Sequence, residues 1–489
     1  MVNQNQTPLL DAIISNAKRP HTPFYTPGHK QGKGISPKLS DYFGKAVFSA
    51  DLTELTELDC LFAPDGVIQQ AQQLAAEAFG SSQTWFLVNG STCGIEAAIL
   101  ATCNDGDKII LPRNVHSSVI SGLILSGAIP IFINPEYDAN SEIAHSITVK
   151  SLEKALEKHP DAEAVMMVYP TYYGVCGDIK AIAQLTHEYN IPLLVDEAHG
   201  AHFAFHPELP ISALNAGADL TVQSIHKTLG AMTQASMLHV QGERININRV
   251  NKALQLTQST SPSYILLASL DAARQQIALH GKELLTQTLQ LAEKARNRIN
   301  KIPGLSILSF PPSPPSPSYL DNTRLTVIVS ELGITGFEAE EILDEKFNVT
   351  PEFASLKTVT FIISLGNTAE DIEQLVKAFK TLAKKYRKPL LKNKKRLLWN
   401  NFPESNTLQL SPRQAFFSST ETVPIKQAIN CISAETVCPY PPGIPLLIPG
   451  EIITSAVVEH LLNVKAMGGF ISNCADTSLC TFKVVTQRG

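Results

Sequence analysis

Leu193–Gly200 reads LLVDEAHG and Val222–Lys227 reads VQSIHK, and these two stretches decide the fold. The first predicts an apolar strand that ends at the carboxylate of Asp196. The second predicts a short strand that ends at the amine of Lys227. A lysine can condense with the aldehyde of pyridoxal phosphate (PLP), while a buried carboxylate pairs with the pyridinium nitrogen of that cofactor. The two stretches therefore predict an α/β domain that holds PLP.

The residues around Lys227 distinguish it from an ordinary lysine. A lone lysine is most often a solvated surface group, but here Ser224 could bind the cofactor phosphate and His226 could act as an acid or base. Asp196 alone would fit a loop carboxylate or a helix cap equally well. Its expected place at the carboxyl end of a strand favours a ligand contact, because ligands bind at that edge of an open α/β sheet. His199 could reach the cofactor or the substrate, and a structural histidine is an equal alternative.

A phosphate site is predicted at Asn89–Gly94, which reads NGSTCG between an expected strand and an apolar helix. Glycine lets the backbone approach an anion closely, and Ser91 and Thr92 supply hydroxyls at the start of the helix. A plain helix N-cap is the alternative. His116 follows the next expected strand on the same sheet edge, so its ring could stack on the pyridine face. A helix-start histidine without a ligand stays open.

Short apolar runs alternate with helical patterns between about residues 84 and 240, which is typical of an α/β domain. Their Val, Ile and Leu content, without clean alternation, predicts strands buried on both faces of a mostly parallel sheet. The expected strands are Thr84–Val88, Lys108–Leu111, Pro130–Ile133, Ala164–Tyr169, Pro192–Val195, Thr221–Gln223 and Ser236–Val240. The helices expected between them include Cys93–Thr102, Ser151–Lys158 and Ile179–Tyr189.

The second half of the chain predicts two further domains. Leu267–Ile302 reads as a long helix, and the proline-rich run Pro311–Pro317 reads as a connector. The elements expected next are strands Leu325–Val329 and Val359–Ile363 and helices Gly336–Lys346 and Ala369–Lys384. The basic run from Lys384 to Arg396 predicts a solvated linker. The expected divisions are an N-terminal segment (1–50), a PLP-binding large domain (51–262), a smaller α/β domain (263–388) and a C-terminal α+β domain (389–489).

Composition limits the class of protein. The 489 residues are 44% hydrophobic and 17% charged, with a net charge of −5, which indicates a globular chain and favours neither nucleic acid nor membrane as a partner. No signal peptide or transmembrane helix is expected, since no suitable apolar run occurs. The eight cysteines form no Cys-x-x-Cys pair and fit reduced thiols in a cytoplasmic protein. The histidines lack metal-site spacing and Gly28–Gly34 lacks P-loop spacing, so neither a metal nor a nucleotide loop is expected.

Four motifs occur in a specific order: Pro27–Lys30 (PGHK), Asp196–Gly200 (DEAHG), Ser224–Lys227 (SIHK) and Pro439–Pro445 (PYPPGIP). Together they resemble the bacterial Orn/Lys/Arg decarboxylase family, over nearly the whole chain. The resemblance implies a fold-type I PLP enzyme, similar to aspartate aminotransferase, that decarboxylates a basic amino acid. Within the family the chain is most similar to the short, Bacillus-type biosynthetic form. This makes arginine the expected substrate and polyamine biosynthesis the expected pathway, with lysine and ornithine as alternatives.

The resemblance also implies which residues hold the cofactor. Lys227 would carry PLP covalently, and Asp196 would hold the ring nitrogen. Ser91, Thr92 and Ser224 would hold the phosphate.

Other roles follow from the same resemblance. His116 would stack on the cofactor ring, His199 would lie beside it, and His226 would lie near the reacting carbon. His29 and Glu435 would bind substrate, with Glu435 facing its distal cation; a solvated carboxylate is the alternative for Glu435.

Two other functions stay open on the same fold. One is an aminotransferase or acyltransferase, which would need a second substrate. The other is a catalytically inactive regulatory protein. Because fold-type I sites are usually built between two subunits, a homodimer or larger homo-oligomer is expected.

Overall fold

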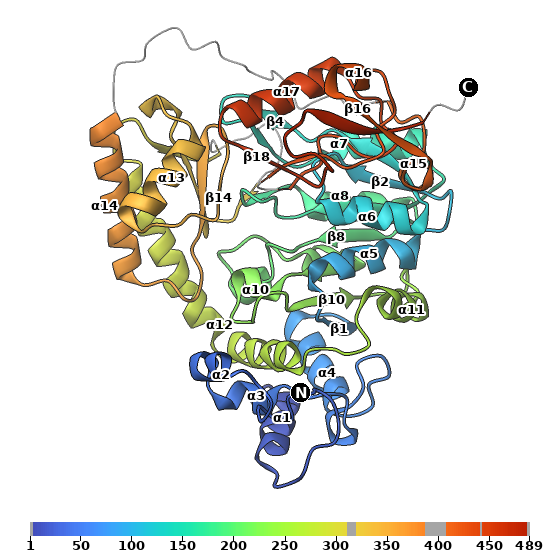
Figure 1. Cartoon of the computed structure of the whole chain (residues 1–489), viewed down its shortest axis with the longest axis vertical. Coiled ribbons are helices and arrows are strands. Elements are labelled where there is room, and N and C mark those ends of the chain that lie inside the picture. The colour runs from blue at the N-terminus through green and yellow to red at the C-terminus, as the bar shows by residue number, and fades with distance from the viewer. Residues whose placement is uncertain (1–2, 311–318, 387–406, 441–442, 487–489) are drawn as a thin grey trace. The chain divides into compact units, whose positions relative to one another are not determined.

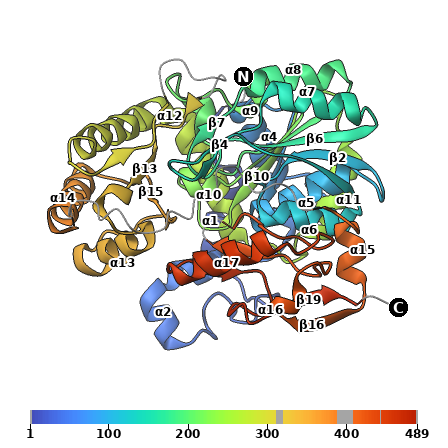
Figure 2. The same cartoon turned by 90° about the horizontal axis from the view of Figure 1, so that it is seen from above.

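The computed structural model describes residues 3–310, 319–386, 407–440 and 443–486. They form two compact units: unit 1 comprises Met1–Thr102 and Leu194–Leu285, and unit 2 comprises Cys103–Leu193 and Thr286–Gly489. Figure 1 shows the course of the chain through its helices and strands, and Figure 2 shows it from above. In the described ranges, no helix is both long and apolar enough to cross a membrane.

Unit 1 contains strands in the order β1-β10-β9-β8. β8 (Leu193–Asp196), whose first residue belongs to unit 2, runs parallel to β9 (Leu220–Gln223). β10 (Ser236–Val240) runs antiparallel to both β9 and β1 (Gln83–Leu87). All four strands lie within one residue of their expected bounds, and nearly all of their residues are buried, as expected. The sequence did not predict that β10 runs opposite to its two neighbours. An apolar run has the same composition whichever way the strand points, so composition carries no information on direction.

Helices of unit 1 pack on these strands and on one another. α5 (Gly90–Thr102) contacts α11 (Ile247–Thr257), and α4 (Val67–Phe79) contacts both β1 and α1 (Pro8–Lys18). After its first turn α5 is mostly apolar, and its buried residues lie between Cys93 and Ala101. The shorter helices of the unit are α2 (Pro37–Phe43), α3 (Lys45–Ala50), α9 (Ala213–Ala216) and α10 (Ile225–Thr228).

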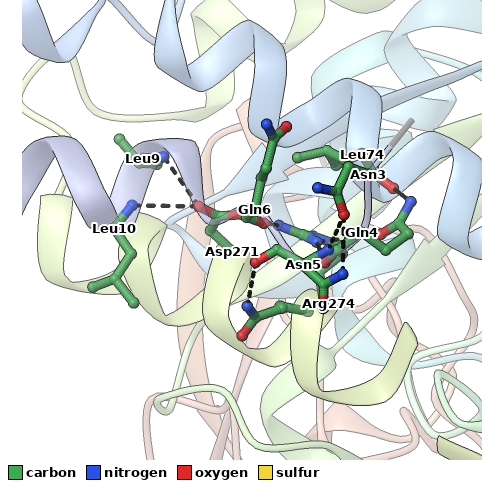
Figure 3. Close-up of polar contacts among 10 residues, drawn as sticks. Asn3, Gln4, Asn5, Gln6, Leu9, Leu10, Leu74, Asp271 and Arg274 are labelled. Atoms are coloured by element: carbon green, nitrogen blue, oxygen red, sulfur yellow. Dashed lines mark hydrogen bonds and ion pairs between the residues drawn. The ribbon is translucent and has the colours of Figure 1, made fainter. Parts of the chain in front are cut away.

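A buried ion pair in the long helix α12 (Tyr264–Ile299) anchors the N-terminal segment of unit 1 (Figure 3). Asp271 and Arg274 are fully buried, and their charged groups lie 2.5 Å apart. Asp271 Oδ2 accepts hydrogen bonds from the N–H groups of Leu9 (3.0 Å) and Leu10 (3.3 Å) at the start of α1. Arg274 donates to two backbone carbonyls that precede α1. Burial raises the pKa of Asp271, and the ion pair with Arg274 opposes this change.

Unit 2 contains three parallel strands in the order β6-β2-β3. These are β6 (Ala162–Val168), β2 (Lys108–Pro112) and β3 (Ile129–Ile133), all close to their expected bounds. The helices that accompany them are α6 (Ser117–Ser126), α7 (Val149–Lys158) and α8 (Ile179–Glu188). Short paired strands complete this part: β4 (Tyr137–Asp138) with β5 (Ile143–Ala144), and β7 (Val175–Cys176) with β12 (Tyr319–Leu320).

A second sheet in unit 2 is antiparallel throughout, with the order β11-β13-β15-β14. Its strands are β11 (Ser306–Ile307), β13 (Arg324–Ile328), β15 (Thr358–Ile362) and β14 (Phe353–Ala354). With helices α13 (Gly336–Phe347) and α14 (Ala369–Tyr386) it encloses a separate hydrophobic core. Strands β13 and β15 and helices α13 and α14 lie close to their expected bounds.

The predicted linkers fall mainly outside the described residues. The Pro311–Pro317 connector and the basic run beyond Tyr386 lie there. The start of that run was placed wrongly, because Lys384 and Lys385 form the last turn of α14 rather than a linker. Lysines are favourable at this position, since they face the negative end of the helix dipole.

The C-terminal part of unit 2 combines helices with small antiparallel strand pairs. β16 (Thr420–Pro424) pairs with β19 (Thr481–Val485), and β17 (Cys438–Tyr440) pairs with β18 (Phe470–Ser472). Its helices are α15 (Pro412–Phe417), α16 (Ile425–Ala428) and α17 (Ser455–Ala466). A third hydrophobic core lies among these elements, which fits the expected α+β organisation.

Candidate active site

Lys227 lies in a short helix and not at the end of a strand, so that detail of the prediction was wrong. β9 ends at Gln223, and Ser224 precedes α10, the four-residue helix that carries Lys227. Lys227 is half-buried, and its Nζ lies 3.1 Å from Nε2 of His199. The turn from strand to helix therefore directs the amine toward the segment that follows β8.

Asp196 and His199 occupy the expected sheet edge. Asp196 is the last residue of β8, and its side chain is buried. Its Oδ1 accepts a hydrogen bond from the N–H of Ala198 at 3.1 Å. Because β8 and β9 are parallel neighbours, their carboxyl ends bring Asp196, His199 and Lys227 to one edge of the sheet.

The predicted phosphate hydroxyls come from two separate elements of unit 1. Ser224 Oγ lies 2.8 Å from Ser91 Oγ, and Ser91 is in the first turn of α5. Thr92 is the next residue and is exposed. Gly90 has a φ of +76°, and no atom would lie within 4 Å of a Cβ at this position, so there is space beside the backbone. Hydroxyls and backbone N–H groups at the start of a 13-residue helix form a favourable anion site.

These features of unit 1 fit PLP. A lysine amine, a buried carboxylate and a hydroxyl pair at a helix start match the aldehyde, the ring nitrogen and the phosphate of the cofactor. His226 lies beside Lys227, and its Nδ1 is 3.0 Å from the carbonyl oxygen of Ala235. Since a carbonyl can only accept, the Nδ1 of His226 carries a proton, and the ring orientation is set by the segment before β10.

His116 belongs to unit 2, where it caps the N-terminus of α6. Its Nδ1 accepts a hydrogen bond from the N–H of Ser118 at 3.2 Å and lies 2.9 Å from the hydroxyl of that serine. Of the two alternatives, the helix-start position is therefore observed. Stacking on the cofactor ring, the second alternative, stays a proposal.

The side chains of both predicted substrate residues accept hydrogen bonds from backbone N–H groups. Glu435, in unit 2, is buried, and its two oxygens accept hydrogen bonds from the N–H groups of Lys483 (2.9 Å) and Ala475 (2.7 Å). His29, in unit 1, accepts from the N–H of Gly32 through Nδ1 and lies 3.0 Å from Asp51 through Nε2. Both side chains are therefore held in fixed orientations.

A buried polar network beside the cofactor residues escaped the sequence analysis. Glu197 accepts hydrogen bonds from the N–H of Ala213 and from Nε2 of Gln223, both at 2.8 Å. Gln223 Oε1 lies 3.2 Å from His239 Nε2, and His239 Nδ1 lies 2.8 Å from the hydroxyl of Thr84. Burial raises the pKa of Glu197 to about 8 and lowers the pKa of His239 to about 3. Glu197 directly follows Asp196 and Gln223 directly precedes Ser224, so the network braces two of the predicted cofactor residues.

The signal that could have revealed this network is the placement of Gln223 and His239 inside otherwise apolar strands. A buried polar side chain in a strand needs a partner, and the partner lies on a neighbouring strand. In the parts of the chain that the structure describes, no cluster of His, Cys, Asp and Glu could hold a metal ion.

Comparison with known families and proteins identifies the chain's relatives. The model of the Orn/Lys/Arg decarboxylase major domain matches residues 7–312, and the model of the C-terminal domain of that family matches residues 395–470. An arginine decarboxylase of Bacillus subtilis is 40% identical over 100% of this chain and 99% of its own length. An arginine decarboxylase of Bacillus anthracis is 41% identical over 99% and 98%.

Solved structures share the fold. A lysine decarboxylase of Francisella novicida has a TM-score of 0.84 and 22% identity, covering 98% of this chain and 81% of that one. An alanine–glyoxylate aminotransferase of Nostoc has a TM-score of 0.54 and covers 75% of this chain. The predicted fold-type I architecture and the resemblance noted from the motifs are thus confirmed. The chain belongs to the Orn/Lys/Arg decarboxylase family.

Proposed function

We propose that this chain is a PLP-dependent decarboxylase that converts arginine to agmatine and carbon dioxide. The observation that carries the choice of arginine is the 40–41% identity, over essentially full length, to Bacillus proteins named arginine decarboxylase. The geometry of unit 1 supports the cofactor, since Lys227, Asp196 and the Ser91–Ser224 hydroxyl pair match its reactive groups.

In this proposal each cofactor residue has a distinct task. Lys227 Nζ would bind the aldehyde carbon of PLP, and His199, 3.1 Å away, would orient that amine. Asp196 would pair with the ring nitrogen. Ser91 and Ser224 would bind the phosphate, and the neighbouring Thr92 would add a third hydroxyl.

The loss of carbon dioxide leaves an electron pair on the α-carbon, and PLP, when bound, supplies the conjugated ring that accepts it. The part of the protein would be to orient the substrate for the breaking of this bond. His226 or Lys227 then delivers a proton to the α-carbon. The stacking role is proposed for His116, whose Nδ1 contacts the N–H and the hydroxyl of Ser118.

Recognition of the distal cation is assigned to Glu435, with His29 as a second substrate contact. A carboxylate with both oxygens held by backbone N–H groups is well oriented, and each oxygen retains capacity for one more donor. A planar guanidinium could use both oxygens at once, whereas an ammonium is a compact point charge. Lysine and ornithine are the alternative substrates.

The test is a parallel assay of arginine, lysine and ornithine with the PLP-loaded protein, with agmatine, cadaverine and putrescine measured as products. Arginine should give the highest kcat/KM, and the Lys227→Ala protein is the control for non-enzymatic release. A higher kcat/KM for lysine or ornithine would reassign the substrate. A requirement for a keto acid, without release of carbon dioxide, would favour an aminotransferase.

The assembly and cellular context are part of the same proposal. A homodimer is supported by the exposed rings of Tyr42 (84%) and Phe43 (55%), whose centroids lie 5.1 Å apart, because adjoining exposed apolar side chains often mark interfaces. Light scattering should give a mass of at least two chains. A role in polyamine biosynthesis in the cytoplasm follows from the proposed product, since agmatine is a diamine precursor.

A further inference from the structure

A buried ion pair in unit 2 connects the end of β2 to the loop around residue 445. Arg113 directly follows β2 and is 3% exposed, and Glu451 is 1% exposed. The guanidinium of Arg113 lies 3.3 and 3.2 Å from the two carboxylate oxygens of Glu451. It also donates to the carbonyl oxygens of Pro445 (2.5 Å) and Leu446 (3.1 Å). One planar side chain therefore holds a carboxylate and two successive carbonyls of the loop.

Both partners of the pair are themselves held in place. Glu451 Oε2 accepts a further hydrogen bond from the N–H of Ile448 at 3.0 Å, which closes the loop on itself. The guanidinium carbon of Arg113 lies 5.2 Å from the ring centroid of Phe132 in β3, which is within the range of a cation–π contact. The pair thus couples the strand edge of unit 2 to the Gly443–Glu451 loop.

The start of this loop lies against His116. Gly443 has a φ of +86°, and a Cβ built on it would lie 3.9 Å from Cδ2 of His116 and 3.5 Å from the ring of Tyr440. A larger residue would be strained at this φ and would fill the space between the two rings. His116 is also three residues downstream of Arg113, so the residue whose side chain holds this loop lies close to the histidine in the chain.

We infer that Arg113 and Glu451 are positioning residues that hold the Gly443–Leu446 strip against His116 and so fix the orientation of its ring. The inference rests on the proposed function, in which that ring stacks on PLP. Stability alone does not account for the pair, because a buried ion pair is often no more stabilising than apolar residues of the same volume. Its planar set of donors does account for the geometry, since a lysine in place of Arg113 could not hold three acceptors in one plane.

The test is a double-mutant cycle with the dissociation constant of PLP as the readout, measured by titrating the full-length apoprotein. The perturbation is the Arg113→Met/Glu451→Leu double variant, which removes the pair without leaving a buried charge unpaired. The second perturbation is His116→Ala. Thermal unfolding of the apoprotein checks that the double variant keeps its stability.

If the pair acts through the histidine ring, the double variant weakens PLP binding by about tenfold when His116 is present and by less than about twofold in the His116→Ala background. Equal weakening in both backgrounds, or no weakening in either, overturns the inference. Arg113→Lys provides a second perturbation, because it keeps the charge opposite Glu451 while removing the planar donors. If the Arg113→Met/Glu451→Leu protein does not fold, the cycle is carried out with Arg113→Lys and His116→Ala, and the same comparison of PLP dissociation constants tests the inference.

Failure of the positioning inference can be distinguished from failure of the proposed function. The titration needs no turnover, so a wild-type protein that binds PLP but decarboxylates none of the three amino acids refutes the reaction while the cycle still tests the positioning. A wild-type protein that does not bind PLP overturns both.

Discussion

Glu197 provides a sharp prediction, because its carboxyl group is fully buried next to Asp196. Replacing it by glutamine keeps the shape of the side chain and removes its ability to ionise. Burial raises the pKa of Glu197 from 4.5 to about 8, although hydrogen bonds from Gln223 and Ala213 oppose this rise. In the unfolded chain the same group titrates near its ordinary value.

The sign of the effect follows from proton binding. Between about pH 4.5 and pH 8 the folded protein holds a proton on Glu197 that the unfolded chain has released, so raising the pH through this range favours unfolding. The difference between the two pKa values, at about 1.4 kcal/mol per pH unit, amounts to ~5 kcal/mol of stability that is present below pH 4.5 and lost by pH 8.

The urea concentration at the midpoint of unfolding should therefore decrease as the pH rises. This decrease should be smaller for the Glu197→Gln protein than for the wild type. The two proteins should be similar near pH 5, and the variant should be the more stable near pH 8. The amide fits the network if Gln223 turns its side chain over and His239 adopts its other neutral tautomer, which leaves every hydrogen bond between Glu197 and Thr84 in place.

The measurement is urea unfolding of the two apoproteins at several pH values between 5 and 8.5, with the difference in unfolding free energy plotted against pH. Taking the difference removes the contribution of other titrating groups, such as the half-buried His145 and His460, whose pKa values are lowered by desolvation. Parallel curves for the two proteins would refute the reasoning, because they would mean that Glu197 titrates alike in the folded and unfolded states.

Three other outcomes are expected. Lys227→Ala should abolish both turnover and the visible absorbance of the lysine-bound cofactor, and a variant that keeps either one would exclude the assignment of Lys227. Asp196→Ala should retain some PLP but lose most activity, because the ring nitrogen loses its partner; near-normal kcat would show that another group holds the ring. Asp271→Ala should lower the urea-unfolding free energy by about 3–5 kcal/mol, since it leaves the buried Arg274 without its carboxylate. A loss below about 1 kcal/mol would show that water or another acceptor reaches that guanidinium.

Many helices and strands could be predicted because each corresponds to a local pattern in the sequence. The strands of both units are nearly unbroken apolar runs, and the helix at α12 has no internal proline over its whole length, so each appeared close to its expected bounds. The place of Asp196 followed from the same logic, since a polar residue directly after a buried strand must lie at the sheet edge. The helix that carries Lys227 was missed because four residues are too few to show a helical period.

The sequence by itself determined the family and, through it, the cofactor that the family implies and the two residues expected to hold that cofactor, because the motifs that contain Asp196 and Lys227 are short and local. The tertiary structure alone decided which distant residues meet. Gln223 with Glu197, Ser224 with Ser91 and Arg113 with Glu451 come from segments that are remote in the chain, and no local pattern encodes such a pair. The physical reason is that a buried polar group must find its partner wherever the packing of strands and loops puts one, and that packing is a property of the whole fold.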